Sequence, residues 1–502
     1  MSTETLSRAA SATLLASFPG DRVPPWLLDR IADGLGGVCL YGSNRGADPS
    51  AVAASLHDAR PGVLVVLDEE GGDVTRVEAA TGSSVPGNAA LGAVDDVDLT
   101  RAVAAALGDA LRSAGVDLDL APCADVNTDA ANPVIGVRSF GSDSGLVARH
   151  TAAFVEGLQG AGVAACVKHF PGHGAVDADS HLELPTLSAP LELLRSRELA
   201  PFRAAIDAGA AAVMTGHLRV PALDRDPATV SHNILTGLLR HGLGFTGAIV
   251  TDALDMAGIG GPAQIPANVV RAVAAGADLC CLGPDNSAGL VDACTSALVG
   301  AVASGAVPEA RLLDAEARVT ALRFLPRNGW PEQPVPRQVS PLGAVGAEAA
   351  RRALRIEGEI PPALSGAHVL ELERPANIAA GTVPWGLAGP LVAADPTTTA
   401  QRLGESADTD TVAGALARAA RRPLVIVVRD PQRRPAQAAL LQSLIAARPD
   451  AIVVDMGWPA VDRPPGSAAR IVTFGASRVS GEAAAAILVA AGAAVPRRTT
   501  RG

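Results

Sequence analysis

The chain has almost no lysine, and this shortage draws attention to one position. Only Lys168 is a lysine among 41 basic residues, so the other 40 are arginines. An ammonium is a compact, rotatable donor and a guanidinium is a planar fork, so the two are not interchangeable in a tight site. Lys168 also lies in the stretch 166–181, which holds three of the nine histidines. We therefore interpret Lys168 as a functional residue, with chance under an arginine-biased composition as the alternative.

Basic charge and long apolar runs are also scarce. The net charge of −11 argues against a nucleic acid or an anionic membrane as partner. No apolar run reaches transmembrane length without glycine, proline or charge, and the apolar patch 12–18 lacks the basic segment of a signal peptide. We expect a cytoplasmic protein without a membrane partner, and the composition leaves its oligomeric state open.

Cysteine is sparse and irregularly spaced. The six cysteines are scattered along the chain, and several lie in apolar, strand-like runs: Cys39, Cys123, Cys166, Cys280, Cys281 and Cys294. This distribution predicts buried free thiols and is not that of a disulfide framework or a zinc site. We therefore expect neither a metal nor another cofactor.

A chain of 502 residues is too long for one core, so more than one domain is expected. Between residues 30 and 325, short apolar runs alternate with helical stretches, and continuous apolar runs suit strands that are buried on both faces. The predicted strands are Gly37–Tyr41, Val63–Leu67, Leu118–Ala121, Ala164–Val167, Ala211–Thr215, Ala248–Thr251 and Asp278–Leu282. Such units, seven or eight in about 300 residues, favour a (β/α)8 TIM-type barrel over a doubly wound sheet.

A second α/β domain is expected after a proline-rich segment. Proline stiffens residues 324–337, which we interpret as a semi-rigid linker. Beyond it a smaller α/β sandwich is predicted, with parallel strands at His368–Leu372, Leu424–Val428, Ala451–Met456 and Ile471–Thr473 and helices at Thr411–Arg421 and Ala436–Arg448. The predicted limits are residues 1–325 for the barrel, 326–342 for the linker, 343–495 for the second domain and 496–502 for a disordered tail.

Polar residues follow the predicted strands at the point where each strand ends. Chemistry in a barrel sits at the C-terminal ends of its strands. These ends carry Asp68–Arg76, Asp125 with Arg138 further along, Lys168 with His169, His217, and Asp252. Because these groups were not used to place the strands, their convergence supports the barrel and predicts one shared site.

Three kinds of site use such a set of residues. His169 and His173 are four residues apart, the spacing of two zinc ligands on a helix, but Pro171 and Gly172 between them prevent a helix. The second kind is a pocket that binds a sugar or an effector without turnover. The third acts on a glycoside, which needs a carboxylate at the anomeric carbon and a proton donor for the leaving oxygen.

Longer motifs favour the third kind. The run Lys168–Gly174 (KHFPGHG), followed by Asp179–His181, resembles the signature of the β-N-acetylglucosaminidase branch of glycoside hydrolase family 3. Val250–Met256 resembles the nucleophile segment of that family and Asp68–Arg76 its sugar-gripping loop, and Asn132–Phe140 and Pro227–Ser231 also fit. The likeness covers most of residues 30–325.

The resemblance implies a role for each matching position. Asp252 would be the nucleophile, His181 the general acid and then the base, and Asp179 the carboxylate that orients His181. The residues that would grip the sugar are Asp68, Arg76, Arg138, Lys168, His169 and His217. Histidine titrates near neutral pH, which suits a group that both gives and takes a proton.

Structural alternatives stand beside several of these roles. Asp252 could cap the end of its strand, although Asp255 is the better candidate for a cap or a solvent-facing carboxylate. Arg138 could form a structural ion pair, and His217 either lines the pocket or satisfies backbone groups.

The loop after Lys168 carries further expectations. His173 is expected to brace the loop through hydrogen bonds, and Asp177 is expected to be solvated. Gly172 and Gly174 are expected to let the loop move and to let the backbone approach the sugar.

Two positions depart from the family pattern, which commonly has glutamine at Glu69 and arginine at Asp73. We expect the added negative charge to affect the aglycone side.

Aromatic residues make up only 3% of the chain and Tyr41 is the single tyrosine, so a short substrate held by hydrogen bonds at one end is expected. The second domain is either structural or lends a loop to the pocket.

The resemblance implies a retaining exo-β-N-acetylglucosaminidase that hydrolyses small N-acetylglucosamine-containing saccharides, such as cell-wall fragments or chito-oligosaccharides. The alternatives within the same site are a phosphorylase and a β-glucosidase. A non-catalytic sugar-binding protein and a metal enzyme are the alternatives from other classes.

Overall fold

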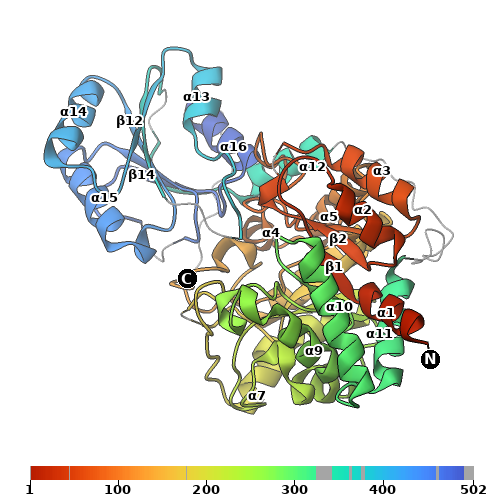
Figure 1. The fold of residues 1–502 in the computed structure, drawn as a ribbon. Coiled ribbons are helices and arrows are strands. Elements are labelled where there is room, and N and C mark those ends of the chain that lie inside the picture. Colours follow the sequence, from red (N-terminus) through yellow and green to blue (C-terminus); the bar gives the residue numbers. More distant parts are fainter. Residues whose placement is uncertain are drawn as a thin grey trace.

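The structure is a computed structural model that describes residues 2–44, 46–176, 178–323, 342–360, 364–374, 379–459 and 463–490. Asp177, the predicted tail and all but residue 342 of the predicted linker lie outside these residues. Two α/β units make up the described chain, a larger N-terminal one and a smaller C-terminal one (Figure 1). The predicted limits between them remain predictions.

Eight parallel strands form the sheet of the larger unit, in the order β7-β6-β5-β4-β3-β2-β1-β8. They are β1 Leu14–Ala16, β2 Gly37–Leu40, β3 Leu64–Leu67, β4 Leu118–Asp119, β5 Ala164–Phe170, β6 Ala212–Thr215, β7 Ala248–Val250 and β8 Cys280–Cys281. A parallel bridge between Val250 and Leu279 joins the two ends of this order. The sheet is therefore a nearly closed barrel, and the predicted fold class is confirmed.

Helices surround the barrel. They are α1 Thr3–Ala12, α2 Pro25–Ala32, α3 Pro49–Ala59, α4 Asn88–Val94, α5 Val97–Ser113, α6 Ser144–Gly160, α7 Leu191–Leu193, α8 Leu199–Asp207, α9 Ile265–Ala275, α10 Ala288–Ala303 and α11 Glu309–Arg323, with π-helical segments at Leu194–Glu198 and Asn233–Gly242. Aspartate side chains accept hydrogen bonds from backbone N–H groups at the starts of α3, α5 and α6. Such caps satisfy donors that a helix start leaves without partners.

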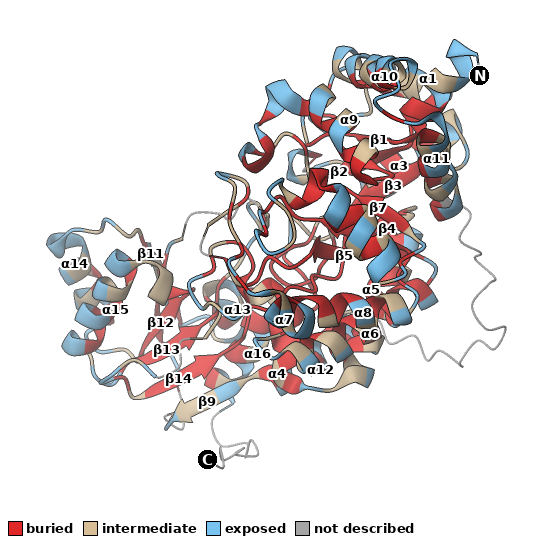
Figure 2. Ribbon diagram, turned by 90° about the horizontal axis from the view of Figure 1, so that it is seen from below, coloured by how far each residue is buried: buried red, intermediate tan, exposed pale blue. Residues whose placement is uncertain are grey.

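The residues of the barrel strands are buried, as their red colour in Figure 2 shows. Along β3, Leu64 and Val66 belong to the core inside the barrel, and Val65 and Leu67 belong to the core between the sheet and its helices. This alternation explains why the strands are continuously apolar. All seven predicted strands are present with shifted ends. The unpredicted β1 has three residues, too few to show a pattern.

The smaller unit holds a six-stranded sheet in the order β11-β10-β12-β13-β14-β9. Its elements are α12 Leu342–Ala353, β9 Arg355–Gly358, β10 His368–Leu372, α13 Ala388–Ala394, β11 Thr399–Leu403, α14 Thr409–Ala419, β12 Leu424–Val428, α15 Pro435–Ala447, β13 Ile452–Asp455, β14 Ala469–Val472 and α16 Arg478–Val489. The four predicted strands form its centre. They pair in parallel, as expected, whereas the unpredicted β9 pairs antiparallel with β14.

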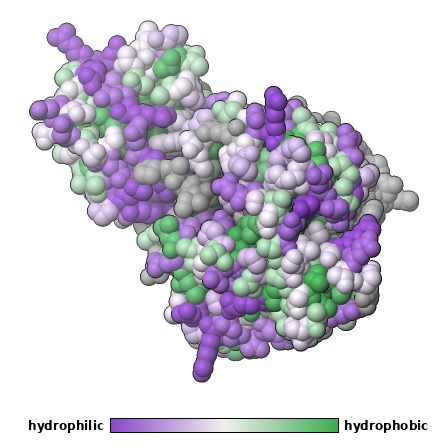
Figure 3. All heavy atoms as spheres, viewed as in Figure 1, coloured by the Kyte–Doolittle hydropathy of each residue, from purple (hydrophilic) through white to green (hydrophobic). Residues whose placement is uncertain are grey.

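The two strands missed in this unit, β9 and β11, lie at the edges of the sheet. Both are largely exposed or half-buried, so neither carries an apolar run that a sequence pattern could reveal. The surface in Figure 3 is mostly hydrophilic over this unit.

The two units are joined by more than the chain. Helix α12 packs against α4 and α5, and its Val345 and Ala349 belong to the outer core of the barrel. Arg352 on α12 also pairs with Asp96 at the start of α5, at 2.9 Å. The second unit is thus packed directly on the barrel.

Two expectations about composition can be compared with the fold. All six cysteines are free and buried, as predicted. Among the described helices, none has both the length and the apolar composition needed to cross a membrane.

Candidate active site

The C-terminal ends of the barrel strands surround a cavity of about 330 Å³. Its wall includes seven of the residues predicted for the site: Asp68, Arg76, Arg138, Lys168, His169, His181 and Asp252. They come from the ends of β3, β5 and β7 and from the loops after β3, β4 and β5. Side chains from distant parts of the sequence therefore meet at one place, as the strand-end rule predicts.

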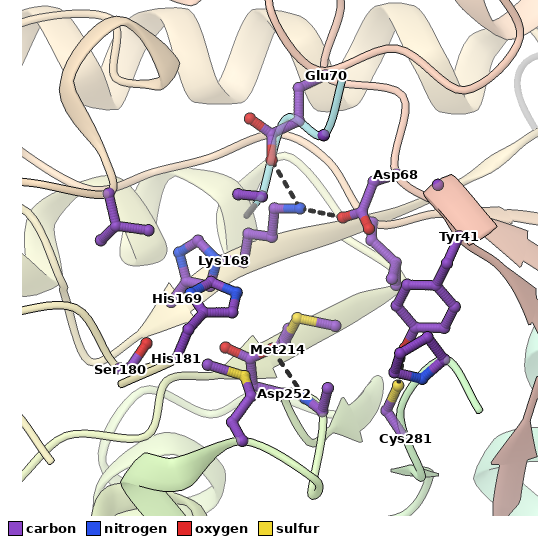
Figure 4. A pocket seen from close by; sticks show the side chains of 18 of the residues that line it. Tyr41, Asp68, Glu70, Lys168, His169, Ser180, His181, Met214, Asp252 and Cys281 are labelled. Carbon is purple, nitrogen blue, oxygen red and sulfur yellow. Dashed lines mark hydrogen bonds and ion pairs between the residues drawn. The ribbon is translucent and has the colours of Figure 1, made fainter. Parts of the chain in front are cut away.

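Lys168 lies at the centre of an ion-pair network. Strand β5 continues to Phe170, so Lys168 and His169 lie within the strand and not after it. The Lys168 side chain is 2% exposed, and its Nζ lies 2.5 Å from Asp68 Oδ1 and 2.7 Å from Glu70 Oε1 (Figure 4). Burial alone would lower the pKa of Lys168, but the charges of Asp68 and Glu70 raise it. The ammonium stays charged and points at two carboxylates.

Glu70 is shared between Lys168 and Arg138. Arg138 binds it through both nitrogens of its fork, with Nη2 at 2.7 Å from Oε1 and Nε at 2.9 Å from Oε2. Burial would raise the pKa of Glu70, but the two cations hold it well below its ordinary value. Arg138 thus forms the structural ion pair considered as its alternative role and also lines the cavity, and its contact with a sugar stays a prediction.

Asp125, which follows β4, holds the His169 loop. Its Oδ2 accepts hydrogen bonds from His169 Nδ1 at 2.7 Å and from the Cys123 thiol at 3.1 Å. Its Oδ1 accepts one from the His173 backbone N–H at 2.6 Å. Burial would raise the pKa of Asp125, but His169 lowers it, so the carboxylate is ionised.

Cys123, Asp125 and His169 each offer a possible metal-ligand atom, and these atoms lie within 4.8 Å of one another. In this structure the three groups satisfy one another by hydrogen bonds through Asp125 Oδ2. The pair His169 and His173, considered from its spacing, lies on a strand and the loop after it, with ring centroids 6.0 Å apart.

His181 and Asp179 form a hydrogen-bonded pair at the cavity. His181 Nδ1 lies 2.7 Å from Asp179 Oδ1, which also accepts the His181 backbone N–H at 2.9 Å. Burial would lower the pKa of His181, but the Asp179 hydrogen bond and the charge of Asp252 raise it. The backbone oxygen of Ser180 accepts the Gly258 N–H at 3.1 Å. That contact ties the His181 loop to the segment that follows Asp252.

Asp252 follows β7 and faces the same cavity as His181 and Lys168 (Figure 4). Its Oδ1 accepts a hydrogen bond from the Ala253 N–H at 2.8 Å. Burial would raise the pKa of Asp252, but the nearby histidines, His217 first among them, lower it. A carboxylate that stays ionised has the charge state that a nucleophile requires.

His217 is fully buried and lies outside the cavity wall, so the expectation that it contacts substrate is corrected. Its Nδ1 lies 2.7 Å from Thr229 Oγ1 and its Nε2 lies 2.8 Å from the Ala253 carbonyl oxygen. Both ring nitrogens are used to hold the backbone next to Asp252. His217 is therefore a positioning residue.

Asp255 was expected to be a cap or a solvent-facing carboxylate, and this expectation is wrong. Asp255 lines the cavity, and its Oδ1 is buried without a hydrogen-bond partner among the described residues. Burial, assisted by the charge of Asp252, raises its pKa. Its position three residues after Asp252, at the end of the same strand, was the available signal for a place in the cavity wall.

Neither unusual acid of the loop at residues 68–76 is among the residues that line the cavity. Glu69 is 2% exposed, and its Oε2 accepts hydrogen bonds from the Arg76 and Val77 N–H groups at 2.8 and 2.9 Å. Burial raises the pKa of Glu69 to about 7. Asp73 pairs with Arg429 of the second unit and accepts the Ala476 N–H at 2.6 Å. Asp73 therefore joins the two units, and the expected effect on the aglycone side stays a prediction.

The second unit also reaches the cavity. Ala379 and Gly381 form part of its wall. The Arg76 guanidinium donates to the carbonyl oxygens of Ala379 at 2.7 Å and Ala380 at 3.2 Å. The second unit was expected either to be structural or to lend a loop to the pocket, and the structure shows the loop. This loop holds Arg76 near Asp68.

The glycines around His173 are packed against protein. A Cβ on Gly172 would lie 2.7 Å from Glu198 Oε2, and one on Gly174 would lie 2.1 Å from the Val126 carbonyl oxygen. The expectation that they serve motion or sugar approach is corrected. His173 braces the loop through its backbone, whose N–H donates to Asp125 and whose carbonyl oxygen accepts from Asn132. Neither ring nitrogen has a hydrogen-bond partner among the described residues.

Comparison with known proteins places these residues in context. Residues 44–322 match the model of the glycosyl hydrolase family 3 N terminal domain. The chain is 36% identical to Beta-hexosaminidase A of Pseudoalteromonas piscicida over 278 residues, which are 50% of this chain and 45% of that protein. It therefore spans less than half of that relative.

A second relative is covered more fully. The chain is 34% identical to a Beta-hexosaminidase of Xanthomonas oryzae pv. oryzae over 296 residues, 55% of this chain and 86% of that protein. Among solved structures, a glycoside hydrolase family 3 beta-N-acetylglucosaminidase from Paenibacillus sp. str. FPU-7 superposes with a TM-score of 0.85 at 32% identity, covering 96% of both chains.

Proposed function

The chain belongs to glycosyl hydrolase family 3 and is a glycoside hydrolase, and we propose that it is a retaining exo-β-N-acetylglucosaminidase. One observation carries the proposal. An ionised carboxylate, Asp252, and a histidine held by a carboxylate, His181 with Asp179, face one cavity. A protein that only binds sugar needs no such pair of reactive groups.

In the first step, the Asp252 carboxylate attacks the anomeric carbon and the glycosidic C–O bond breaks. The proton on His181 Nε2 passes to the leaving oxygen, because Nδ1 is engaged by Asp179. The raised pKa of His181 favours the protonated form that this step needs. In the second step, His181 takes a proton from water, the resulting hydroxyl bonds to the anomeric carbon, and Asp252 leaves.

The size and polarity of the cavity support a single terminal sugar as the bound group. A cavity of about 330 Å³ lies at the small end of ligand sites. The ion-paired groups Asp68, Lys168 and Arg138 offer donors and acceptors for sugar hydroxyls on its wall. We propose small β-N-acetylglucosaminides, such as cell-wall fragments or chito-oligosaccharides, as substrates. Six buried free thiols support a reducing compartment such as the cytoplasm.

The deciding experiment compares nitrophenyl β-N-acetylglucosaminide with nitrophenyl β-glucoside. We expect kcat/KM to favour the N-acetylglucosaminide by roughly tenfold or more. The first-formed sugar should have the β configuration by NMR, because two displacements at one carbon retain stereochemistry. A preference for the glucoside, or an α product, would contradict the proposal.

Phosphorolysis is the alternative outcome for the second step. A histidine base does not repel phosphate as a carboxylate does, and three cations line the cavity. These cations are already engaged, however, Lys168 and Arg138 by Glu70 and Arg76 by backbone oxygens. We therefore propose hydrolysis. Product analysis with and without millimolar phosphate tests this choice, and sugar 1-phosphate as the main product would replace it with phosphorolysis.

A further inference from the structure

His173 is a buried imidazole whose hydrogen-bonding capacity is unused. It is 1% exposed and lines the cavity, yet neither Nδ1 nor Nε2 has a partner among the described residues. A buried polar group without a partner destabilises a folded protein, so such groups normally meet water, an ion or a ligand. Because this one faces the sugar cavity, a bound sugar is the natural partner.

The backbone around His173 holds the ring in place. The His173 N–H donates to Asp125 Oδ1 at 2.6 Å, and its carbonyl oxygen accepts the Asn132 Nδ2 hydrogen at 3.0 Å. The neighbours on both sides, Gly172 and Gly174, have no room for a Cβ. The imidazole is therefore presented to the cavity from a closely packed loop, as a preorganised contact requires.

The charge state of His173 defines which partners suit it. Burial lowers its pKa to about 4, although Asp125 and Asp252 oppose that effect. The ring is thus neutral near pH 7, with one nitrogen as donor and the other as acceptor. A neutral group that both donates and accepts matches a hydroxyl or an amide better than it matches an anion.

The neighbours of His173 indicate which part of the sugar it faces. Its ring centroid lies 6.0 Å from that of His169, and both rings line the same cavity as Asp252. Asp252 attacks the anomeric carbon in the proposed reaction, so His173 faces atoms near that carbon. The leaving oxygen is served by His181. The ring oxygen gains positive charge in the transition state, which disfavours a donor there. The substituent on C2 is the polar group that remains.

We propose that His173 is a specificity-determining residue that hydrogen-bonds the C2 substituent of the sugar in the cavity. The proposal rests on the proposed function, because Asp252 must mark the anomeric carbon. An acetamido group can pair with either ring nitrogen of His173, because it offers an N–H to a nitrogen that accepts and a carbonyl oxygen to a nitrogen that donates. Hydrogen bonds to the C2 position strengthen in the transition state, so the contact contributes to kcat as well as to binding.

The test uses the full chain with two substitutions, His173→Phe and His173→Gln. Phenylalanine keeps a planar ring but removes both nitrogens, whereas glutamine keeps one donor and one acceptor. Each variant is assayed with nitrophenyl N-acetylglucosaminide, glucoside and 2-deoxyglucoside. We expect His173→Phe to lower kcat/KM for the N-acetylglucosaminide by roughly 10- to 100-fold, with His173→Gln less affected. The 2-deoxyglucoside should show less than a roughly threefold change, because it has no C2 group to lose.

Equal losses on all three substrates would overturn the proposal, because they indicate a packing role or a buried water. An unchanged N-acetylglucosaminide reaction in His173→Phe would also overturn it. Calorimetry makes the same comparison without turnover: His173→Phe should weaken the binding of N-acetylglucosamine but not that of 2-deoxyglucose. A wild-type preference for the glucoside would contradict the proposed function. The His173 proposal is judged separately, because it requires the loss of kcat/KM in His173→Phe to be confined to sugars that carry a substituent on C2.

Discussion

Asp179 Oδ1 receives two hydrogen bonds from the same residue, one from the ring Nδ1 of His181 and one from its backbone N–H. This double contact sets both the tautomer of the ring and its direction. It also contributes to the raised pKa of His181, against the opposing effect of burial.

Replacing Asp179 by asparagine should therefore shift the pH profile. His181 must be protonated for the first step, so activity falls as pH rises through its pKa. Loss of the carboxylate lowers that pKa, and the alkaline limb of kcat/KM should move to lower pH. We expect kcat to fall roughly 100-fold with a poor leaving group. A lower kcat with an unmoved alkaline limb would show that Asp179 does not act on His181.

Replacing His181 by alanine should give a loss that depends on the leaving group. Substrates with acidic leaving groups need no proton in the first step, so their glycosylation should be nearly normal. Natural disaccharides should lose roughly 100-fold or more in kcat/KM. Measuring kcat/KM across nitrophenyl, methylumbelliferyl and disaccharide substrates tests this order, and a uniform loss would contradict the acid role.

Replacing Asp252 by alanine should lower kcat by roughly 1,000-fold or more while leaving binding largely intact, because its role is bond making. Kinetics with the nitrophenyl substrate and calorimetric binding of N-acetylglucosamine separate the two effects. Asp255→Ala is the matched control, because it removes a carboxylate from the same wall. Turnover close to wild type in a folded Asp252→Ala protein would refute the assignment.

Replacing Glu69 by glutamine should change how stability depends on pH. The folded pKa of Glu69 is about 7, above its ordinary value of 4.5, so folding favours its protonated form. Stability from this group is present below about pH 4.5 and is lost as pH rises toward 7. The glutamine variant should gain on the order of 3 kcal/mol relative to wild type by the upper end of that window. Denaturant unfolding at several pH values measures the difference, and a constant difference would contradict the prediction.

Replacing Asp73 by asparagine should loosen the contact between the units. Its side chain is 5% exposed and pairs with Arg429. Breaking one side of a buried pair costs about 3 kcal/mol. The matched control is Glu348→Gln, which breaks a pair with Arg351 whose side chains are 45% and 63% exposed, and which should cost less than about 1 kcal/mol. Similar unfolding midpoints for both variants would show that Asp73 does not join the units.

Much of the barrel and its site could be predicted because the signals are local. A buried strand such as β3 is a continuous apolar run, and the polar residues after it fall where the fold places chemistry. Glu70 was within reach of the same reasoning, since residues two apart on an extended chain, Asp68 and Glu70, point the same way. The roles of Asp252, His181 and Asp179 remain predictions from resemblance.

The missed features depend on contacts between residues far apart in sequence. Arg76 is held by Ala379 and Ala380, and Asp73 by Arg429 and Ala476, across more than 300 positions. A single sequence shows an unusual acid at position 73 but not the arginine that explains it. The proposed sugar contact of His173 was missed for a related reason. Its place in the sequence suggested a metal ligand or a residue that braces the loop, and only the structure shows that neither ring nitrogen has a hydrogen-bond partner among the described residues.

Strand β1 pairs with β2 on one side and with β8 on the other, where Leu14 lies opposite Cys280. During synthesis one edge of β1 therefore stays unpaired until the ribosome has made β8, more than 200 residues later. At about 5–20 residues per second, this delay lasts on the order of 10–50 s. An unpaired strand edge can join another chain during that time. The nascent protein is thus most exposed to misassembly just before the last barrel strand emerges, when the closing partner is still missing and the rest of the sheet is already made.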